Sequence, residues 1–336
     1  MSCFFFDGIF NMTHAIRIHQ TGGPEVLQWE QIEVGDPAEG QVRLRQSACG
    51  LNYIDVYGRS GLYPVGDLPA VIGMEAVGTV EAVGSGVDSL AVGDRVAYPM
   101  VLGAYAEARN IDAAKLVKLP DNIADETTAA MMLKGLTAHY LLFRTYPVKA
   151  GDNILVYAAA GGVGLILCQW ANHLGANIIG CVGSEEKAEL ARANGCHHTI
   201  LYRDEDIASR VREITDGAGV AAAYDSIGKA TFESSLDSLA PFGVLATYGN
   251  ASGPVEPFNP MILAPKGSLY VTRPTLATHV STQALLQEGA DRLFQVVGDG
   301  TVDINVNQSF ALSECAEAHR QLEARNTTGS TILKID

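Results

Sequence analysis

The chain has 336 residues, of which 47% are hydrophobic and 18% charged, and this length is typical of two globular domains. The 38 acidic residues outnumber the 23 basic ones and give a net charge of −15, so nucleic acid is not expected as a partner. The six cysteines include no CxxC pair, which argues against a cysteine-rich zinc site and a disulfide framework. Their usage indicates reduced, mostly buried thiols in a cytoplasmic protein.

The N-terminal end is apolar, but residues 1–11 lack the basic start and the cleavage site of a signal peptide. Met12 opens a second plausible start, so we interpret residues 1–11 as an extension, either disordered or outside the native start. Residues 154–168 form the longest uncharged apolar run. Glycines interrupt this run and it is too short to cross a membrane, so no membrane partner is expected.

Short segments that alternate apolar with small or polar residues fill the first 135 residues, and Gly, Pro and Asp separate them. This pattern predicts an all-β barrel or sandwich. The clearest expected strands are residues 15–20, 41–50, 75–84 and 94–98.

The pattern changes over residues 136–275, where apolar strands alternate with helices. Such an alternation predicts βαβ units and an α/β domain with a doubly wound parallel sheet. We expect strands over residues 153–159, 177–183, 197–202, 220–228 and 244–250, and helices over residues 164–175, 185–195, 206–217 and 231–243.

The chain ends with expected helices over residues 281–300 and 312–325 and an expected strand over residues 330–336. The change of pattern predicts that an α/β domain of residues 136–275 is inserted into a β-rich domain. That discontinuous domain would consist of residues 12–135 and 276–336.

A glycine-rich loop follows the first strand of the α/β region and leads directly into a helix. Aligned on GxGxxG, the three positions are Ala159, Gly161 and Gly164, so alanine replaces the first glycine. The strand, turn and helix supply the context that a dinucleotide-binding fingerprint requires. Gly161 would let the backbone approach a pyrophosphate, and Gly164 would let the helix pack closely on the strand. We expect cofactor contacts from Ala160, Gly161, Gly162, Val163 and Gly164; the alternative is a tight turn without a ligand.

The second strand of this region indicates which dinucleotide is bound. An NAD-type site places a carboxylate at the tip of that strand, but Gly183 and Ser184 stand there instead. Lys187 and Tyr202, a cation and a phenol, suit a ribose 2′-phosphate, so we predict NADPH as the cofactor. The two acidic residues before Lys187 are interpreted as first-turn helix residues. The alternative for Lys187 is a solvated helix lysine.

The motifs of the chain resemble those of the medium-chain dehydrogenase/reductase superfamily, and within it the zinc-independent quinone oxidoreductases of the ζ-crystallin-like branch. The resemblance covers essentially everything from Met12 onward, with one departure at Asn172, where the family usually has Lys or Arg. It implies a GroES-like β-barrel catalytic domain, a Rossmann NADPH-binding domain and a homodimer. Its motifs lie at residues 19–27, 50–64, 73–87, 93–98, 133–142, 158–171, 267–276 and 327–336.

Zinc members of this superfamily hold a catalytic metal through cysteine and a Gly-His-Glu motif. Asn52 stands at the first of these positions, and Gly73-Met74-Glu75 replaces Gly-His-Glu. An amide and a thioether do not make a zinc site, which needs thiolate and imidazole ligands. We therefore expect no metal.

A quinone or an activated enone is already electrophilic, so hydrogen-bond donors alone can stabilise the developing oxyanion. The resemblance places four candidate donors around the substrate: Asn52, Tyr57, Tyr63 and Arg273. For each of them the alternative is a structural hydrogen bond. Further cofactor contacts are expected, by the same resemblance, from Asn52, Lys134, Thr137, Tyr248, Asn250 and Arg325.

These observations predict an NADPH:quinone oxidoreductase that transfers a hydride or electrons without a metal. A second candidate is an NADPH-dependent alkenal or enone double-bond reductase of the same superfamily. A third candidate is a dinucleotide-binding protein without catalysis, with an RNA-binding or crystallin-like role, although the acidity argues against RNA.

Overall fold

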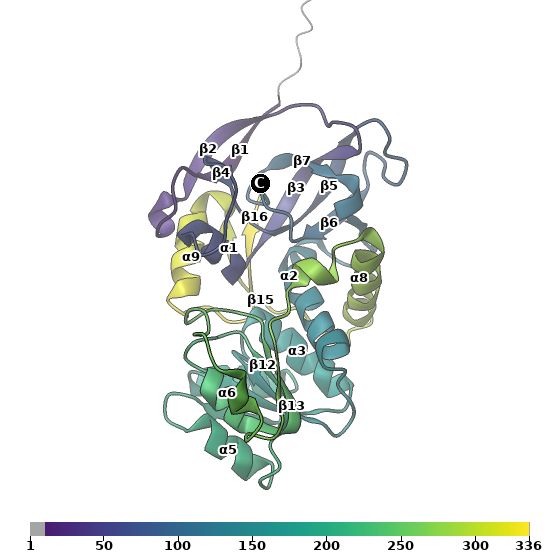
Figure 1. The fold of residues 1–336 in the computed structure, drawn as a ribbon. Coiled ribbons are helices and arrows are strands. Elements are labelled where there is room, and N and C mark those ends of the chain that lie inside the picture. Colours follow the sequence, from purple (N-terminus) through teal and green to yellow (C-terminus); the bar gives the residue numbers. More distant parts are fainter. Residues whose placement is uncertain (1–10, 336) are drawn as a thin grey trace, which may run out of the picture. The chain divides into compact units, whose positions relative to one another are not determined.

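The computed structural model describes residues 11–335, which divide into two compact units (Figure 1). Of the described residues, the first unit contains 11–133, 308–327 and 331–335. The second unit contains residues 134–307 and 328–330. The first unit contains two sheets and the second unit one, and each unit has its own buried core. The expectation for residues 1–11 lies outside the described residues except at Asn11, which begins strand β1.

The first unit is β-rich, as its alternating segments predict. A three-stranded sheet has the order β2-β1-β4, and a seven-stranded sheet has the order β15-β16-β3-β5-β6-β8, with β7 paired to β3. Alternate residues are buried over residues 41–47 of β3, which is the period expected of a strand with one face on a core, and the last four residues of the strand are all buried. The strands are β1 Asn11–Ile18, β2 Gln28–Val34, β3 Gln41–Leu51, β4 Ala70–Val71, β5 Glu75–Val83, β6 Arg95–Pro99, β7 Ala108–Asp112, β8 Val117–Lys118, β15 Val306–Ala311 and β16 Ser330–Lys334.

A buried polar network joins two helices of the first unit, α1 (Tyr53–Ser60) and α9 (Cys315–Glu323). The Arg59 guanidinium donates to both carboxylate oxygens of Glu323, at 2.9 and 2.8 Å, and lies 3.1 Å from Nδ1 of His319. Tyr105 Oη lies 3.4 Å from His319 Nε2 and donates to Asp55 Oδ2 at 2.8 Å. Because buried charges are stable only when paired and hydrogen-bonded, this network fixes the C-terminal helix against α1.

The second unit is a parallel sheet of six strands in the order β11-β10-β9-β12-β13-β14, which is the doubly wound arrangement that the sequence predicts. The order in which successive strands are added reverses between β9 and β12. Sheets of this kind bind their ligands at such a point, beyond the carboxyl ends of the strands. The strands are β9 Asn153–Tyr157, β10 Asn177–Val182, β11 His198–Leu201, β12 Val220–Asp225, β13 Leu239–Thr247 and β14 Tyr270–Thr272.

Helices cover this sheet, and Figure 1 shows α5 and α6 near β12 and β13. The expected helix over 231–243 is shorter in the structure, since α6 ends at Ser238 and β13 begins at Leu239. Pro241 and Gly243 disfavour helix, and Phe242 takes a left-handed φ of 63°. The helices are α2 Asp125–Tyr140, α3 Gly162–His173, α4 Glu185–Ala193, α5 Ile207–Ile214, α6 Phe232–Ser238, α7 Leu276–His279 and α8 Gln283–Gly298.

Helix α8 belongs to the second unit, which extends to Asn307, beyond the expected boundary at residue 275. The contact with α2 gives the physical reason. A Cβ on Gly289 of α8 would lie 2.9 Å from Leu136, and one on Gly135 would lie 2.5 Å from Leu293. These two glycines let the helices approach closely, so α8 buries its apolar face against α2.

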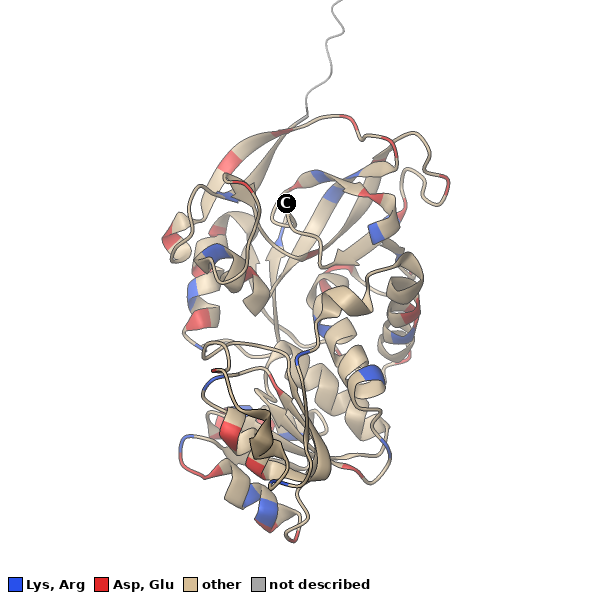
Figure 2. Ribbon diagram, viewed as in Figure 1, with Lys and Arg blue, Asp and Glu red and all other residues tan. Residues whose placement is uncertain are grey.

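Charges of both signs are distributed over both units, and Figure 2 shows no basic stripe among the residues that it draws in colour. The five described cysteines are free and buried, as the sequence predicts, and Cys3 lies outside the described part. Within residues 11–335, no helix is long and apolar enough to cross a membrane.

The buried network makes stability depend on pH. Burial and the nearby Arg59 lower the pKa of His319 to about 3, so the folded state takes up this proton less readily than the unfolded state. The free energy of unfolding should therefore fall as pH falls from about 6.5 toward 3, by about 1.4 kcal/mol per pH unit for this group. Urea unfolding between pH 7 and 4.5 should show a smaller slope for His319→Gln than for the wild type. The surface substitution His198→Gln is the control, and equal slopes for His319→Gln and the wild type would refute this assignment.

Candidate active site

The loop between β9 and α3 has the geometry of a dinucleotide-binding turn. Ala158 takes a left-handed φ of 50°, and Gly161 caps α3 without a side-chain hydrogen bond to the first helical turn. A Cβ on Gly164 would lie 2.3 Å from the carbonyl oxygen of Ala158, so the helix contacts the strand end directly. A Cβ on Gly161 would have no atom nearer than 3.2 Å. A Cβ at Gly161 would therefore be in tight contact with the Ala158 carbonyl, whereas a Cβ at Gly164 would collide with it.

Lys134 and Thr137 lie together on α2 and are both buried, each with 5% of its surface exposed. The stem of Lys134 lies against Gly162, where a Cβ would be 2.6 Å from Lys134 Cδ. Lys134, which is predicted to contact the cofactor, therefore lies beside the glycine loop.

A short segment near the C-terminus also contacts this loop. Gly329 N donates to Ala160 O at 2.9 Å, and Gly329 pairs with Gly161 as an isolated parallel bridge. Ser330 Oγ would lie 3.1 Å from a Cβ on Gly162. Gly329 directly precedes the expected strand over residues 330–336, and its contact with the loop was not predicted, because the pairing joins residues about 170 positions apart.

The end of β10 brings together the four residues predicted to read the cofactor ribose. Ser184 caps α4 by accepting from Lys187 N at 3.4 Å. A Cβ on Gly183 would lie 2.7 Å from the Tyr202 hydroxyl, so the phenol lies against the strand tip. The neighbouring Glu185 is ion-paired with Arg192 along the same helix, which directs that carboxylate away from the tip.

The end of β12 adds a carboxylate, Asp225, that was not predicted as a site residue from the sequence. Asp225 is fully buried and accepts from Ile227 N, Gly228 N, Thr231 Oγ1 and Ser235 Oγ at 2.7 to 3.1 Å. It therefore shapes the loop after β12. Asp225 could have been identified from the sequence by its position at the carboxyl end of a buried parallel strand.

Tyr248 and Asn250 follow β13, and Tyr248 N donates to Asp225 O at 2.8 Å. Burial raises the pKa of Tyr248, so its hydroxyl stays protonated at neutral pH. The Thr247 hydroxyl at this strand end is buried and has no hydrogen-bond partner within the part of the chain that the structure describes. An orphaned hydroxyl and a glycine turn that leads into a helix N-terminus on the carboxyl edge fit a bound dinucleotide.

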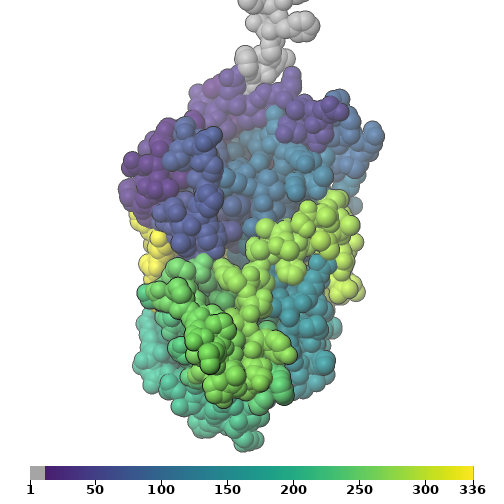
Figure 3. Space-filling model, in the orientation of Figure 1, coloured from purple at the N-terminus to yellow at the C-terminus, as the bar shows by residue number. Residues whose placement is uncertain are grey.

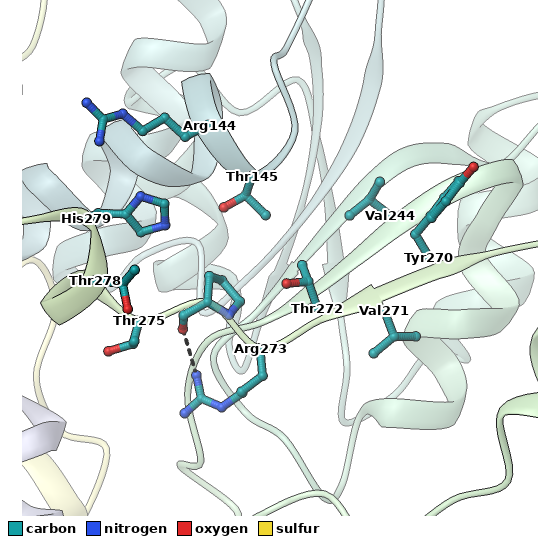
Figure 4. Close-up of a pocket in the computed structure, with 11 residues that line it drawn as sticks. Arg144, Thr145, Val244, Tyr270, Val271, Thr272, Arg273, Thr275, Thr278 and His279 are labelled. Atoms are coloured by element: carbon teal, nitrogen blue, oxygen red, sulfur yellow. Dashed lines mark hydrogen bonds between the residues drawn. The ribbon is translucent and has the colours of Figure 1, made fainter.

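Arg273 lines a cavity of about 540 Å³ in the second unit. The cavity lies at β14 and α7, and Figure 4 shows Arg273 beside Thr272 and Thr275. Arg273 donates to Pro274 O at 3.3 Å, whereas Arg144, on the π-helical turn Leu141–Thr145, pairs with Glu288 at 2.9 Å. His279 stacks on Tyr140 with ring centroids 4.4 Å apart. The cavity therefore presents a cation and several hydroxyl groups.

The other predicted substrate contacts lie in the first unit, at the start of α1. Asn52 precedes this helix, and its Nδ2 donates to Glu75 Oε1 at 2.7 Å. Its backbone N donates to Asp55 Oδ2 at 2.8 Å. The Tyr57 and Tyr63 rings meet edge to face with centroids 5.3 Å apart, and Tyr63 N donates to Tyr57 O. The structure thus brings Asn52, Tyr57 and Tyr63 together on one short segment.

Arg325 and Arg273 fall in different units. Arg325 follows α9 with a left-handed φ of 61°, and its backbone N donates to Leu322 O.

The positions of the superfamily's metal ligands do not fit a metal here. Glu75 uses both carboxylate oxygens, since Oε1 accepts from Asn52 and Oε2 accepts from Leu133 N at 2.6 Å. Met74 contributes only a thioether. Across residues 11–335, no three His, Cys, Asp or Glu side chains are grouped so as to hold a metal ion.

Two protein families match the sequence. The alcohol dehydrogenase GroES-like domain matches residues 38–121, and the zinc-binding dehydrogenase family matches residues 162–288. A quinone oxidoreductase from Pseudomonas aeruginosa is 53% identical over 96% of this chain and 99% of its own. A 2-haloacrylate reductase from a Burkholderia species is 48% identical over the same shares. The crystal structure of Escherichia coli quinone oxidoreductase complexed with NADPH matches with a TM-score of 0.94 and 46% identity, over 96% of this chain and 100% of that one.

The glycine turn permits a matched pair of substitutions. Gly164→Ala should lower the free energy of unfolding by about 1–3 kcal/mol, because its Cβ would collide with the Ala158 carbonyl. Gly161→Ala should cost less stability than Gly164→Ala, since its Cβ would lie 3.2 Å and not 2.3 Å from the Ala158 carbonyl oxygen, and it should weaken dinucleotide binding because a side chain there hinders the approach of the pyrophosphate to the backbone. Urea unfolding and fluorescence titration with NADPH measure the two effects. A Gly164→Ala variant as stable as the wild type would contradict this account.

Proposed function

The chain belongs to the quinone oxidoreductases of the medium-chain dehydrogenase/reductase superfamily, and we propose that it is an enzyme that reduces quinones with NADPH. One observation carries the proposal: the carboxyl edge of the parallel sheet provides a side-chain-free glycine turn at the start of a helix, together with Lys187 and Tyr202. The quinone oxidoreductases of Pseudomonas aeruginosa and Escherichia coli, which match over nearly their whole length, support it. The NADPH complex of the Escherichia coli enzyme supports the choice of cofactor.

In this proposal the residues around the glycine turn hold and orient the cofactor. Backbone N–H groups at the start of α3 face the pyrophosphate, and Ala160, Gly161, Gly162, Val163 and Gly164 form the turn. Gly183, Ser184, Lys187 and Tyr202 read the ribose end, and Lys134, Thr137, Tyr248, Asn250 and Arg325 complete the contacts. Bound NADPH supplies the hydride.

The substrate needs hydrogen-bond donors where negative charge develops on its oxygen. We assign this task to Tyr57, Tyr63 and Arg273, which carry hydroxyl and guanidinium donors. Each well-placed donor contributes on the order of 3 kcal/mol to lowering a barrier of this kind. No metal is assigned a part, because Asn52, Met74 and Glu75 do not form a zinc site.

A second activity is supported by a specific relative. The Burkholderia 2-haloacrylate reductase is 48% identical, and its name describes the reduction of an activated carbon–carbon double bond in a carboxylic acid. Arg273 and the threonines of its cavity could bind such a carboxylate. We therefore propose reduction of activated enones and α,β-unsaturated acids as the alternative.

Steady-state assays separate the two activities. NADPH oxidation should be fast with 1,4-benzoquinone or 9,10-phenanthrenequinone and slow with 2-alkenals and 2-haloacrylate. A kcat/KM for alkenals or haloacrylates far above that for quinones would establish the alternative instead. If the protein oxidises NADPH with none of these compounds, the third candidate is favoured: a dinucleotide-binding protein without catalysis, with an RNA-binding or crystallin-like role.

The preference for NADPH is tested at the tip of β10. Lys187→Ala should weaken NADPH binding roughly 10- to 100-fold and leave NADH binding nearly unchanged, because a charge-assisted hydrogen bond contributes about 1.5–3 kcal/mol. Fluorescence titration measures both affinities. Lys266→Ala, which removes a lysine paired with Asp237, is the matched control. Equal losses for the two cofactors would show that Lys187 does not bind the 2′-phosphate.

We also propose a cytoplasmic homodimer. The free, buried thiols suit a reducing compartment. Strand β14 is an edge of its sheet, Tyr270 on it is 59% exposed, and Figure 3 shows this light-green part of the chain at the surface. An exposed strand edge is a ready site for pairing with a second copy. Sedimentation equilibrium giving the mass of a monomer would refute the dimer.

A further inference from the structure

Glu75 is a fully buried carboxylate at the first residue of β5. Its Oε1 accepts from Asn52 Nδ2 at 2.7 Å, and its Oε2 accepts from Leu133 N at 2.6 Å. Gly50 leaves room for this side chain, since a Cβ there would lie 2.1 Å from Glu75 Oε1. The carboxylate therefore connects the segment before α1 with α2, at the residue next to Lys134.

These contacts determine which way the Asn52 amide faces. A carboxylate can only accept hydrogen bonds, so the amino group of Asn52, and not its carbonyl oxygen, must face Glu75. The second amino hydrogen points to Gly50 O at 3.5 Å. Both hydrogens of the Asn52 amide are thus directed at acceptors within the protein.

We infer that Glu75 is a positioning residue that turns the Asn52 amino group inward, so that Asn52 meets a ligand only as a hydrogen-bond acceptor. This inference rests on the proposed function for its effect on the reaction, and it replaces the expectation that Asn52 donates to a quinone oxygen. A quinone oxygen can only accept, so the donors left for it are Tyr57, Tyr63 and Arg273.

An acceptor at this position suits a ligand that carries a hydroxyl group. Two sources have this chemistry: a ribose hydroxyl of the cofactor and the hydroxyl of a reduced quinone. If the ribose hydroxyl of the cofactor is the ligand, turning the Asn52 amide from acceptor to donor should change the dissociation constant of NADPH. The second predicts an effect on kcat/KM for the quinone at an unchanged NADPH dissociation constant.

A double-mutant cycle at positions 75 and 52 tests the inference. In Glu75→Gln the new amide keeps its oxygen on Leu133 N, so its amino group faces Asn52, which must rotate and turn its own amino group toward the ligand. In Asn52→Asp two carboxylates face each other. In the double variant Glu75→Gln/Asn52→Asp the Gln amide donates to Asp, and the second Asp oxygen again presents an acceptor.

Each single substitution should lower kcat/KM or NADPH affinity roughly 10- to 100-fold, the loss typical of a misplaced contact group. The double variant should have a higher kcat/KM or a higher NADPH affinity than Glu75→Gln, because it again presents a hydrogen-bond acceptor to the ligand. Glu107→Gln, which alters a partly buried carboxylate that accepts from Thr13 Oγ1 and His14 N, is the matched control and should stay within about twofold of the wild type.

The inference would be overturned if the double variant had no higher kcat/KM or NADPH affinity than Glu75→Gln. It would also be overturned if the fold-loss of the double variant equalled the product of the fold-losses of the two single variants. Unfolding by urea, measured on each variant, separates this result from a structural role, which would alter stability and leave kcat/KM and NADPH affinity of the folded protein unchanged. Should Asn52→Asp not fold, the comparison of Glu75→Gln with the double variant decides. If the wild-type protein reduced no quinone, the proposed function would be refuted but the inference about Glu75 would not. The double-mutant cycle would then be measured with NADPH dissociation constants.

Discussion

The close contact between helix α3 and the end of strand β9 is the constraint on which the cofactor half of this protein depends. No side chain fits at Gly164, whose Cβ would lie 2.3 Å from the Ala158 carbonyl. The helix therefore begins directly at the strand end, and its unsatisfied N–H groups point to the carboxyl edge of the sheet. The same edge carries the tips of β10, β12 and β13, so residues far apart in the sequence, such as Ser184 and Asp225, lie at one edge of the sheet.

The first unit is organised by buried polar contacts where zinc members of the superfamily place metal ligands. Glu75 accepts from Asn52 and from Leu133, and Asp55 accepts from Asn52 and Tyr105. Buried carboxylates are stable when their oxygens receive such hydrogen bonds. The segment that carries Asn52, Tyr57 and Tyr63 is therefore held in place by carboxylates, with no need for a metal ion, and its tyrosine hydroxyl groups suit substrates that are already electrophilic.

Much of this architecture could be predicted because it depends on local patterns. Alternating apolar residues around Val42 and Leu44 predicted a strand of the β-rich domain, and the alternation of apolar strands with helices over residues 136–275 predicted a parallel sheet. Gly183, Ser184, Lys187 and Tyr202 could be grouped because adjacent parallel strands end at one edge. The prediction failed at the boundary of α6 with β13, where tertiary pairing extends the strand back to Leu239. It also missed the contact of Gly329 with Ala160, since no local pattern encodes a pairing over so many residues.

The sequence by itself therefore determined the class of the two folded units, the dinucleotide turn and the loss of the metal ligands at Asn52 and Met74. These features depend on residue type and short spacing, which are readable along the chain. Only the tertiary structure decided how the polar groups are paired, because hydrogen-bond partners come from distant segments. It showed that Glu75 faces the amino group of Asn52, and that the fully buried His319 joins Arg59 to Tyr105. A carboxylate in a sequence shows its charge, but the donors that surround it after folding decide its role.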